Sequence, residues 1–159
     1  MGRIKFPASS PTILIFFLTF HFAGSSARLL LADRTRQVLY QIPLFPGSSV
    51  STAIALPLKD VRRPAGVDFD PVDGYVYWSD RSRDKIFRAY LNGSSQVQLV
   101  DELLTPGGIA VDPVGRNLYW TDRGGNRIGV SRLDGSYRKT LVYQNLNDPA
   151  DIVLDMENG

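Results

Sequence analysis

The sequence predicts an all-β fold built from repeated units of four short strands. Three observations support this. The landmarks of one stretch recur 42 residues later without a gap. The apolar runs within a unit are about five residues long and are bounded by turn-forming residues. No segment shows the apolar period of 3.6 residues that marks an amphipathic helix.

The repeat is carried by a Pro-led run, an aromatic pair and a polar turn. In the first full copy these are PAGVDFDP at 64–71, YWSD at 77–80 and LNGS at 91–94. The second copy reads PGGIAVDP, YWTD and LDGS at the same spacing, and a third begins at Pro149. A partial copy precedes them, with LLAD at 30–33 in the place of the aromatic motif. We expect blade-like units at about 28–63, 64–105, 106–148 and, incomplete, 149–159.

The second full unit shows the expected strands most clearly. Its apolar runs are Gly108–Asp112, Asn117–Asp122, Arg127–Leu133 and Arg138–Tyr143. Gly and Asn between the runs tolerate a positive φ, and Pro presets φ, so each interval is a turn with a physical cause. A repeated four-stranded unit of this length is typical of a β-propeller blade.

The first 27 residues form a separate segment. Arg3 and Lys5 precede an uncharged apolar run at 13–22, and small residues follow up to Ala27. This three-part pattern predicts a secretory signal peptide at 1–27, cleaved after Ala27, with the domain at 28–159. A membrane anchor is the alternative, but a span needs roughly 20 apolar residues.

The composition excludes several classes of function. The chain has 18 basic and 16 acidic residues, and two of the basic residues, Arg3 and Lys5, lie in the expected leader. The expected domain is therefore left with 16 basic and 16 acidic residues. The remaining balance of charge argues against a nucleic-acid partner, which requires a basic surface. Cys is absent and the single His is His21, so the domain offers no disulfide, no Ser-His-Asp triad and no His-ligated zinc.

The aromatic motif indicates a family. Tyr77-Trp78-Ser79-Asp80 and Tyr119-Trp120-Thr121-Asp122, with the downstream Ile and Leu-x-Gly-Ser landmarks, resemble the YWTD repeat of low-density lipoprotein receptor relatives. The resemblance covers 29–159 and implies an incomplete six-bladed YWTD β-propeller, with a partial first blade, two full blades and the start of another. It also implies an extracellular receptor module with no catalysis, cofactor or metal.

The position of the repeats narrows the resemblance. They follow directly after the expected leader, with no Cys-rich module between, an arrangement most like that of the Wnt co-receptors. This implies a cell-surface or secreted location, with Wnt-type ligands or their antagonists as secreted protein partners. Two alternatives stay open: an endocytic lipoprotein-type receptor or nidogen-like matrix protein, and, more distantly, a calcium-dependent propeller hydrolase.

The motif residues themselves are expected to be structural. Adjacent Tyr and Trp side chains on a strand point to opposite faces, so both rings can pack between blades. The Asp that ends the strand can accept N–H bonds from the following turn. This set comprises Tyr77, Trp78, Asp80, Tyr119, Trp120, Thr121 and Asp122. Six blades would need about 250 residues, so we expect 28–159 to be a fragment of limited stability.

One end of the blades is the expected ligand face. In an up-and-down blade the second-to-third turns and the links between blades share one end, where the family binds its ligands. The candidates there are Arg34, Arg62, Arg63, Arg81, Arg83, Asp84, Arg123 and Asn126. Arg62-Arg63 stands where the Wnt co-receptors carry acids, so the resemblance predicts a more basic face and an acidic or anionic ligand.

Two further motifs are weaker. Asn92-Gly93-Ser94 is an N-glycosylation sequon at a third-to-fourth turn, on the opposite end, where a glycan would leave the ligand face open. An unmodified Asn-Gly turn is its alternative. The acidic stretch at 68–74 is similar to a calcium loop, but its spacing is one residue off, so a strand end plus turn is favoured.

Overall fold

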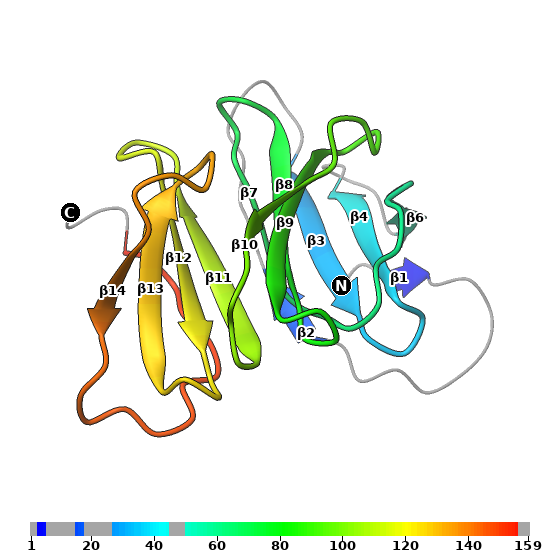
Figure 1. Cartoon of the computed structure of the whole chain (residues 1–159). Helices are drawn as coiled ribbons and strands as arrows, with labels where there is room; N and C mark the ends of the chain where they lie inside the picture. The colour runs from blue at the N-terminus through cyan, green and yellow to red at the C-terminus, as the bar shows by residue number, and fades with distance from the viewer. Residues whose placement is uncertain (1–2, 6–14, 18–26, 45–49, 156–159) are drawn as a thin grey trace.

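The computed structural model describes residues 3–5, 15–17, 27–44 and 50–155. Three four-stranded antiparallel sheets stand side by side in this part of the chain (Figure 1). The first contains β2 (Ile15–Phe17), β3 (Ala27–Asp33), β4 (Val38–Leu44) and β6 (Ile54–Ala55). The second contains β7 (Pro64–Phe69), β8 (Tyr75–Asp80), β9 (Lys85–Tyr90) and β10 (Val97–Val100). The third contains β11 (Pro106–Asp112), β12 (Asn117–Asp122), β13 (Arg127–Arg132) and β14 (Lys139–Val142).

Within each sheet the strands are neighbours in the order of the sequence. This up-and-down arrangement is that of a propeller blade, so the predicted all-β class and blade architecture are confirmed. In the third sheet β12 has the predicted bounds, β11 begins two residues earlier at Pro106, and β13 and β14 are slightly shorter than predicted. The early start of β11 reflects an irregular register between Pro106 and Ile109.

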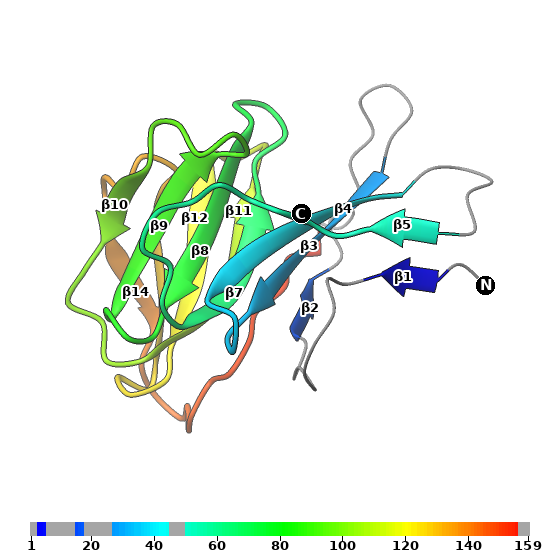
Figure 2. The same ribbon diagram turned by 90° about the vertical axis from the view of Figure 1, so that its right-hand side faces the viewer.

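The first sheet draws a strand from the expected leader. β2 pairs with β3 through Ile15↔Ala32 and Phe17↔Leu30, in the position that β7 and β11 hold in the other sheets. A separate parallel pair joins β1 (Arg3–Lys5) to β5 (Val50–Thr52), as Figure 2 shows. Most of the expected leader lies outside the described residues, and its cleavage after Ala27 stays a prediction.

The aromatic motif joins neighbouring sheets because its two rings point in opposite directions. Trp78 is buried with Leu30 and Leu39 of the first sheet, and its ring stacks on Phe87 at 5.5 Å between centroids. Tyr77, the preceding residue, is fully buried in the other direction among side chains of the third sheet, Trp120 included. The two rings of the second sheet therefore fill the spaces between it and both of its neighbouring sheets.

The third motif position adds a polar contact in the same gap. The Ser79 hydroxyl donates to the Gly107 carbonyl of the third sheet at 2.6 Å and accepts from the Gly66 N–H at 2.8 Å. A Cβ placed on Gly66 would lie 2.7 Å from the Ile109 backbone nitrogen, so the two innermost strands can approach only where a side chain is absent. This close contact fixes β7 against β11.

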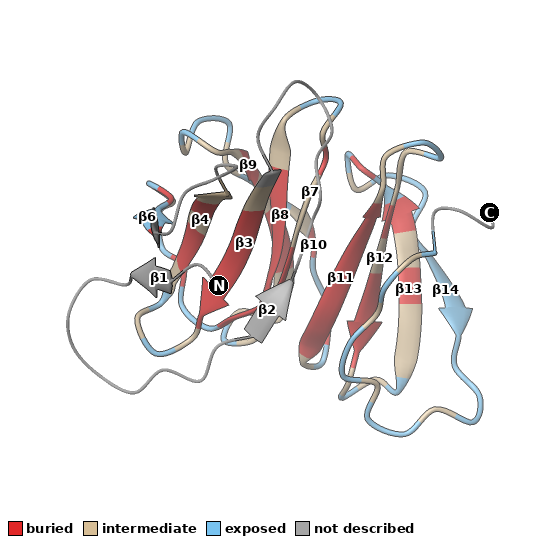
Figure 3. Ribbon diagram, turned by 180° about the vertical axis from the view of Figure 1, so that it is seen from behind, coloured by how far each residue is buried: buried red, intermediate tan, exposed pale blue. Residues whose placement is uncertain are grey.

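The third sheet has one covered and one open face. β11 is almost wholly buried, whereas every residue of β14 is exposed (Figure 3). Tyr119 is only half-buried where its counterpart Tyr77 is fully buried, because no described element covers that side. Residues 149–155 run beside β11, with the Gly108 N–H donating to the Ala150 carbonyl at 3.0 Å.

In the parts of the chain that the structure describes, no helix has the length and apolarity to cross a membrane.

Candidate ligand-binding face

Strand register brings the predicted ligand-face residues to one end of the three sheets. Pro64 pairs with Asp80 and Pro106 with Asp122, so each link between sheets ends beside the turn that follows the motif. The turns after β3, β8 and β12 therefore share the end that lies lowest in Figure 1. The candidate set occupies these turns and the link before β7.

Buried carboxylates hold the backbone of this end in place. Both oxygens of Asp80, which is fully buried, accept backbone N–H bonds, from Arg62 at 2.9 Å, Arg63 at 3.1 Å and Ser82 at 3.0 Å. Asp122 is equally buried and accepts from the Leu104 N–H at 2.8 Å. One carboxylate thus fixes both the link and the turn, and the side chains above them stand on a rigid base.

The structure divides the predicted arginines into two groups. Arg62 and Arg83 both pair with Asp60, the former through Nε at 3.0 Å, and the Arg83 guanidinium lies 5.1 Å from the Phe87 ring centroid. Asp60 was not among the predicted residues. It neutralises the outer part of this face, and no local signal in the sequence distinguishes it from any other exposed acid in a link.

The second group consists of Arg34, Arg63, Arg81 and Arg123, and we call it the arginine cluster. Partial burial, together with the nearby charges of Arg63 and Arg123, lowers the pKa of Arg34. Partial burial first, and then the other three guanidinium groups, lower the pKa of Arg81 to about 10, while Asp148 opposes the shift. Like charges are therefore gathered here in a setting that is partly removed from water.

Members of the arginine cluster have different partners. The Arg81 Nε–H donates to the Pro106 carbonyl at 3.0 Å, which ties the second sheet to the third. Arg123 forms a two-pronged ion pair with Asp148, with Nε to Oδ1 at 2.6 Å, and this pairing raises the pKa of Arg123 and lowers that of Asp148. The Asn126 side-chain oxygen accepts from the Asp148 N–H at 2.9 Å and supports the pair.

Asp84 plays a backbone part at this end. It has a φ of 54° in the β8–β9 turn, and its carbonyl accepts from the Leu103 N–H at 3.4 Å. Its side chain has no hydrogen bond or ion pair within the described residues. The predicted residues thus lie on one face, but they differ in how much charge they leave available to a ligand.

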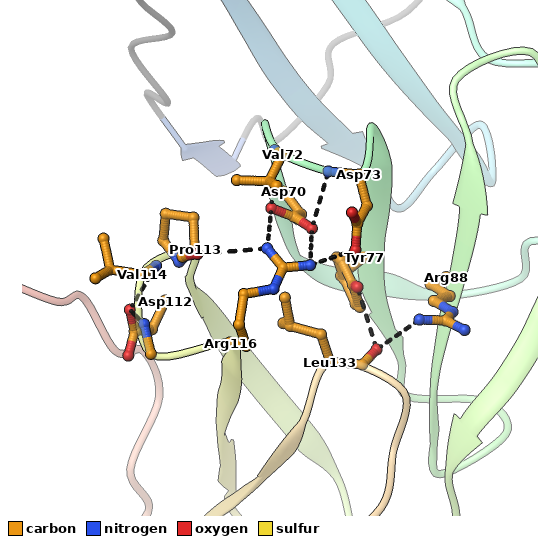
Figure 4. Close-up of polar contacts among 11 residues, drawn as sticks. Asp70, Val72, Asp73, Tyr77, Arg88, Asp112, Pro113, Val114, Arg116 and Leu133 are labelled. Atoms are coloured by element: carbon orange, nitrogen blue, oxygen red, sulfur yellow. Dashed lines mark hydrogen bonds and ion pairs between the residues drawn. The ribbon is translucent and has the colours of Figure 1, made fainter.

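A second polar cluster, missed by the sequence reasoning, lies at the opposite end. Arg116 of the β11–β12 turn donates from two nitrogens to the fully buried carboxylate of Asp70, at 2.9 and 2.8 Å, and also contacts Asp73 (Figure 4). Beside it, the Tyr77 hydroxyl and an Arg88 guanidinium N–H both donate to the Leu133 carbonyl, at 3.1 and 2.8 Å. These contacts close the interface between the second and third sheets. The sequence signal that could have pointed to this cluster is Asp70, an acid at the end of a predicted strand within the acidic stretch at 68–74.

The acidic stretch at 68–74 is therefore a turn held by protein groups. Asp70 accepts from the backbone N–H groups of Val72 at 3.1 Å and Asp73 at 3.3 Å in addition to Arg116. Asp68 points to β11 and accepts from the Val111 N–H at 2.7 Å. Burial raises the pKa of Asp68 to about 6, against the effect of its hydrogen bonds with Val111 and Phe69. Among the described residues no group of three or more His, Cys, Asp or Glu side chains could hold a metal ion.

The Asn92 sequon lies at the β9–β10 turn, away from the arginine cluster. Its side-chain oxygen accepts from the Ser94 N–H at 3.0 Å and the Ser94 hydroxyl at 2.7 Å, and the side chain is exposed. The turn is therefore accessible for modification.

Comparison with known sequences agrees with the repeat and its motif. Residues 74–113 and 116–156 match the family model of the low-density lipoprotein receptor repeat class B. Low-density lipoprotein receptor-related protein 5 of Homo sapiens is 47% identical over 81 residues, which is 50% of this chain and 5% of that protein. Low-density lipoprotein receptor-related protein 4 of Homo sapiens is 45% identical over 49 residues, 31% of this chain and 3% of that protein. The chain therefore corresponds to a small part of these relatives.

Solved structures place the sheets in the same architecture. A chain from the nidogen/laminin complex superposes with a TM-score of 0.72 at 34% identity, over 80% of this chain and 49% of that one. A streptogramin B lyase gives 0.62 at 18% identity, over 80% and 41%. A gluconolactonase from Xanthomonas campestris gives 0.60 at 18% identity, over 80% and 49%. At 18% identity the two enzymes share the fold alone.

Proposed function

The chain belongs to the low-density lipoprotein receptor class B repeat family, and on this basis we propose that it is an extracellular ligand-binding module of a receptor-related protein. The observation that carries the proposal is the end of the sheets where exposed charged turns stand on buried carboxylates. Such an arrangement presents side chains in fixed positions without needing an enzyme's reactive groups. The proposed role is recognition of a secreted protein.

The proposed partners are Wnt-type ligands or their secreted antagonists. The identity to receptor-related protein 5 favours this class over the alternatives. The likeness to a chain solved in the nidogen/laminin complex supports the alternative of a matrix-binding protein, and an endocytic receptor is a further one. All three place the chain in the secretory pathway and at the cell surface or outside the cell, and all use protein ligands.

A glycan placed on the candidate face tests the proposal. The link at 144–148 lies on this end, and Asn147→Thr would create an N-glycosylation sequon that begins at Asn145, which is exposed. The chain secreted from expressing cells is immobilised, and purified Wnt-type ligand, antagonist and laminin are passed over it. We expect one of these to bind the wild-type chain and to lose binding when Asn145 carries a glycan, because the glycan covers the face.

Two variants serve as matched controls. Asn147→Ala changes the same position without creating a sequon, and Asn92→Gln removes the native sequon from the opposite end. Both should bind like the wild type. Binding that survives a glycan at Asn145 would move the ligand site to another face, and binding by laminin alone would favour the matrix alternative.

The hydrolase alternative has its own test. If the fold carried a catalytic calcium, a chelator would lower the thermal midpoint of the chain or abolish lactone hydrolysis by it. We expect a chelator to change neither the midpoint nor ligand binding. A loss of structure on chelation would contradict the receptor assignment.

A further inference from the structure

The three repeats place different residues at one equivalent pair of positions. The first position follows the motif Asp at the end of the second strand and is held by Arg34, Arg81 and Arg123 in turn. The second precedes the Pro that opens the next unit and is held by Arg63, Thr105 and Asp148. The pair Arg123–Asp148 forms a two-pronged ion pair. The equivalent pair Arg34–Arg63 therefore has a cation where its counterpart has a carboxylate.

Arg34 also retains an unused donor. Its Nε is buried, and it has no hydrogen-bond partner among the groups that the structure describes. In Arg123 the same nitrogen makes the 2.6 Å bond to Asp148. A buried N–H without an acceptor costs free energy, so this site gains by receiving an acceptor oxygen from outside.

The electrostatic surroundings favour an anion at the same place. Arg34, Arg63 and Arg81 form no ion pair with any carboxylate in the described ranges, whereas Arg123 is paired. Arg63 is exposed and reachable from solvent. A carboxylate can accept two parallel N–H bonds from a guanidinium, which is the geometry that Arg123 and Asp148 already show.

The acids around the site favour a single carboxylate over a polyanion as its ligand. Arg123 is already paired with Asp148, and both Arg62 and Arg83 are paired with Asp60. These acids leave no continuous row of unpaired cations for a sulfated glycan to follow, and they would repel its neighbouring sulfates. A single Asp or Glu side chain on a peptide segment meets no such repulsion.

We propose that Arg34 and Arg63 form a site for one Asp or Glu carboxylate of a secreted protein partner, taking the place that Asp148 holds beside Arg123. The proposal rests on the proposed function, since it names the chemistry of the partner at the same face. It assigns the site to a residue pair rather than to the face as a whole. Arg81 adds charge at the edge of the site.

A peptide pair and a charge-reversal pair test the site. The probes are the peptide Gly-Ser-Asp-Gly-Ser with blocked ends and its Asn counterpart, added to the isotope-labelled full chain. The readout is the arginine Nε–Hε resonance of Arg34. We expect the Asp peptide to shift this resonance and the Asn peptide to leave it unchanged, because the amide has no charge to pair with two guanidinium groups.

Arg63→Asp should abolish the response to the Asp peptide and raise the thermal midpoint, because it restores the ion pair of the third unit within the chain. Lys59→Asp makes the same change of charge at an exposed residue in the same link, outside the predicted ligand-face set, and should alter neither. Arg63→Ser, which only removes the cation, should weaken peptide binding roughly tenfold without raising the midpoint. It also covers the case in which Arg63→Asp fails to fold.

Several results would overturn the site. These are an equal response to both peptides, an equal loss from Lys59→Asp and Arg63→Asp, an unchanged affinity in Arg63→Ser, or binding of a heparin oligosaccharide without binding of the Asp peptide. The two proposals fail separately. A secreted partner that is blocked by the Asn145 glycan but binds Arg63→Asp like the wild type removes the site and keeps the function. A chain that binds the Asp peptide but no secreted partner keeps the site and removes the function.

Discussion

Replacing Arg116 with methionine should lower the free energy of unfolding by about 2–3 kcal/mol. The Asp70 carboxylate is fully buried and receives two guanidinium N–H bonds, at 2.9 and 2.8 Å. Methionine keeps most of the length of the side chain but offers no donor. The charge of Asp70 would then remain buried without its cation.

The magnitude follows from what remains around Asp70. Removing one partner of a buried ion pair costs about 3–5 kcal/mol when nothing else compensates the charge. Here the N–H groups of Val72 and Asp73 still donate to Asp70, and the Arg116 side chain is 34% exposed. Both facts reduce the cost to the lower end of that range or somewhat below it.

Urea unfolding followed by tryptophan fluorescence measures the effect. Trp120 is buried in the interface between the second and third sheets, which Arg116 supports, and Trp78 is buried in the interface between the first and second sheets, so their emission reports unfolding of both interfaces. Arg132→Met is the matched control: Arg132 lies at the same end and is exposed, and its side chain donates, within the described residues, to the Gly115 carbonyl and the Asn117 side chain. We expect Arg132→Met to change stability by less than about 0.5 kcal/mol.

A second variant separates the ion pair from the lost side chain. Arg116→Met combined with Asp70→Asn removes the buried charge as well as its partner, so part of the lost stability should return. The reasoning would be refuted by an Arg116→Met chain as stable as the wild type, or by an Arg132→Met chain destabilised to the same extent. Either result would mean that the pair is not a significant contact between the second and third sheets.

Three further predictions concern single residues. The raised pKa of Asp68 means that its contribution to stability is fully present below about pH 4 and is lost as the pH rises through about 6, a change of about 3 kcal/mol. Unfolding of Asp68→Asn at several pH values should therefore lack this decline, and parallel curves for both chains would contradict it. Gly129→Ala should cost about 1–3 kcal/mol in the same urea assay, since its Cβ would lie 2.4 Å from the Trp120 ring, and an unchanged midpoint would show that the ring can move. The secreted wild-type chain should lose apparent mass with a glycosidase, and Asn92→Gln should not respond. A wild-type chain that does not respond either would show that the sequon is unused.

Much of the fold could be predicted because it depends on short-range rules. The period of two along a strand places Tyr77 and Trp78 on opposite faces, and the structure buries each ring against a different neighbouring sheet. The turn residues set the strand bounds, so β12 has the predicted limits. Strand β2 was not predicted, because its residues have the composition of a leader. Its place in the first sheet depends on pairing with β3, whose residues lie more than ten positions away in the sequence.

The candidate site could be predicted only in outline. Register and blade topology place the predicted arginines at one end, but they do not show which guanidinium groups find an acid. Asp60 takes up the charge of Arg62 and Arg83, and Asp148 that of Arg123. The cation pair Arg34–Arg63 emerges only when these pairings are known. The Arg116–Asp70 pair joins residues 46 positions apart and was not anticipated.

By itself the sequence determined the repeat, the strand alternation and the turns, because each of these depends on residues within a few positions of one another. Only the tertiary structure decided which charges are neutralised within the chain and which stay available, because the ion pairs of Arg83, Arg116 and Arg123 each require two side chains from different turns or links to meet within hydrogen-bond distance. The arginine cluster shows the difference. Its members are visible in the sequence as three arginines that follow the motif Asp and one that precedes a proline. Their unequal pairing depends on whether the link that folds back beside each turn brings an acid to it.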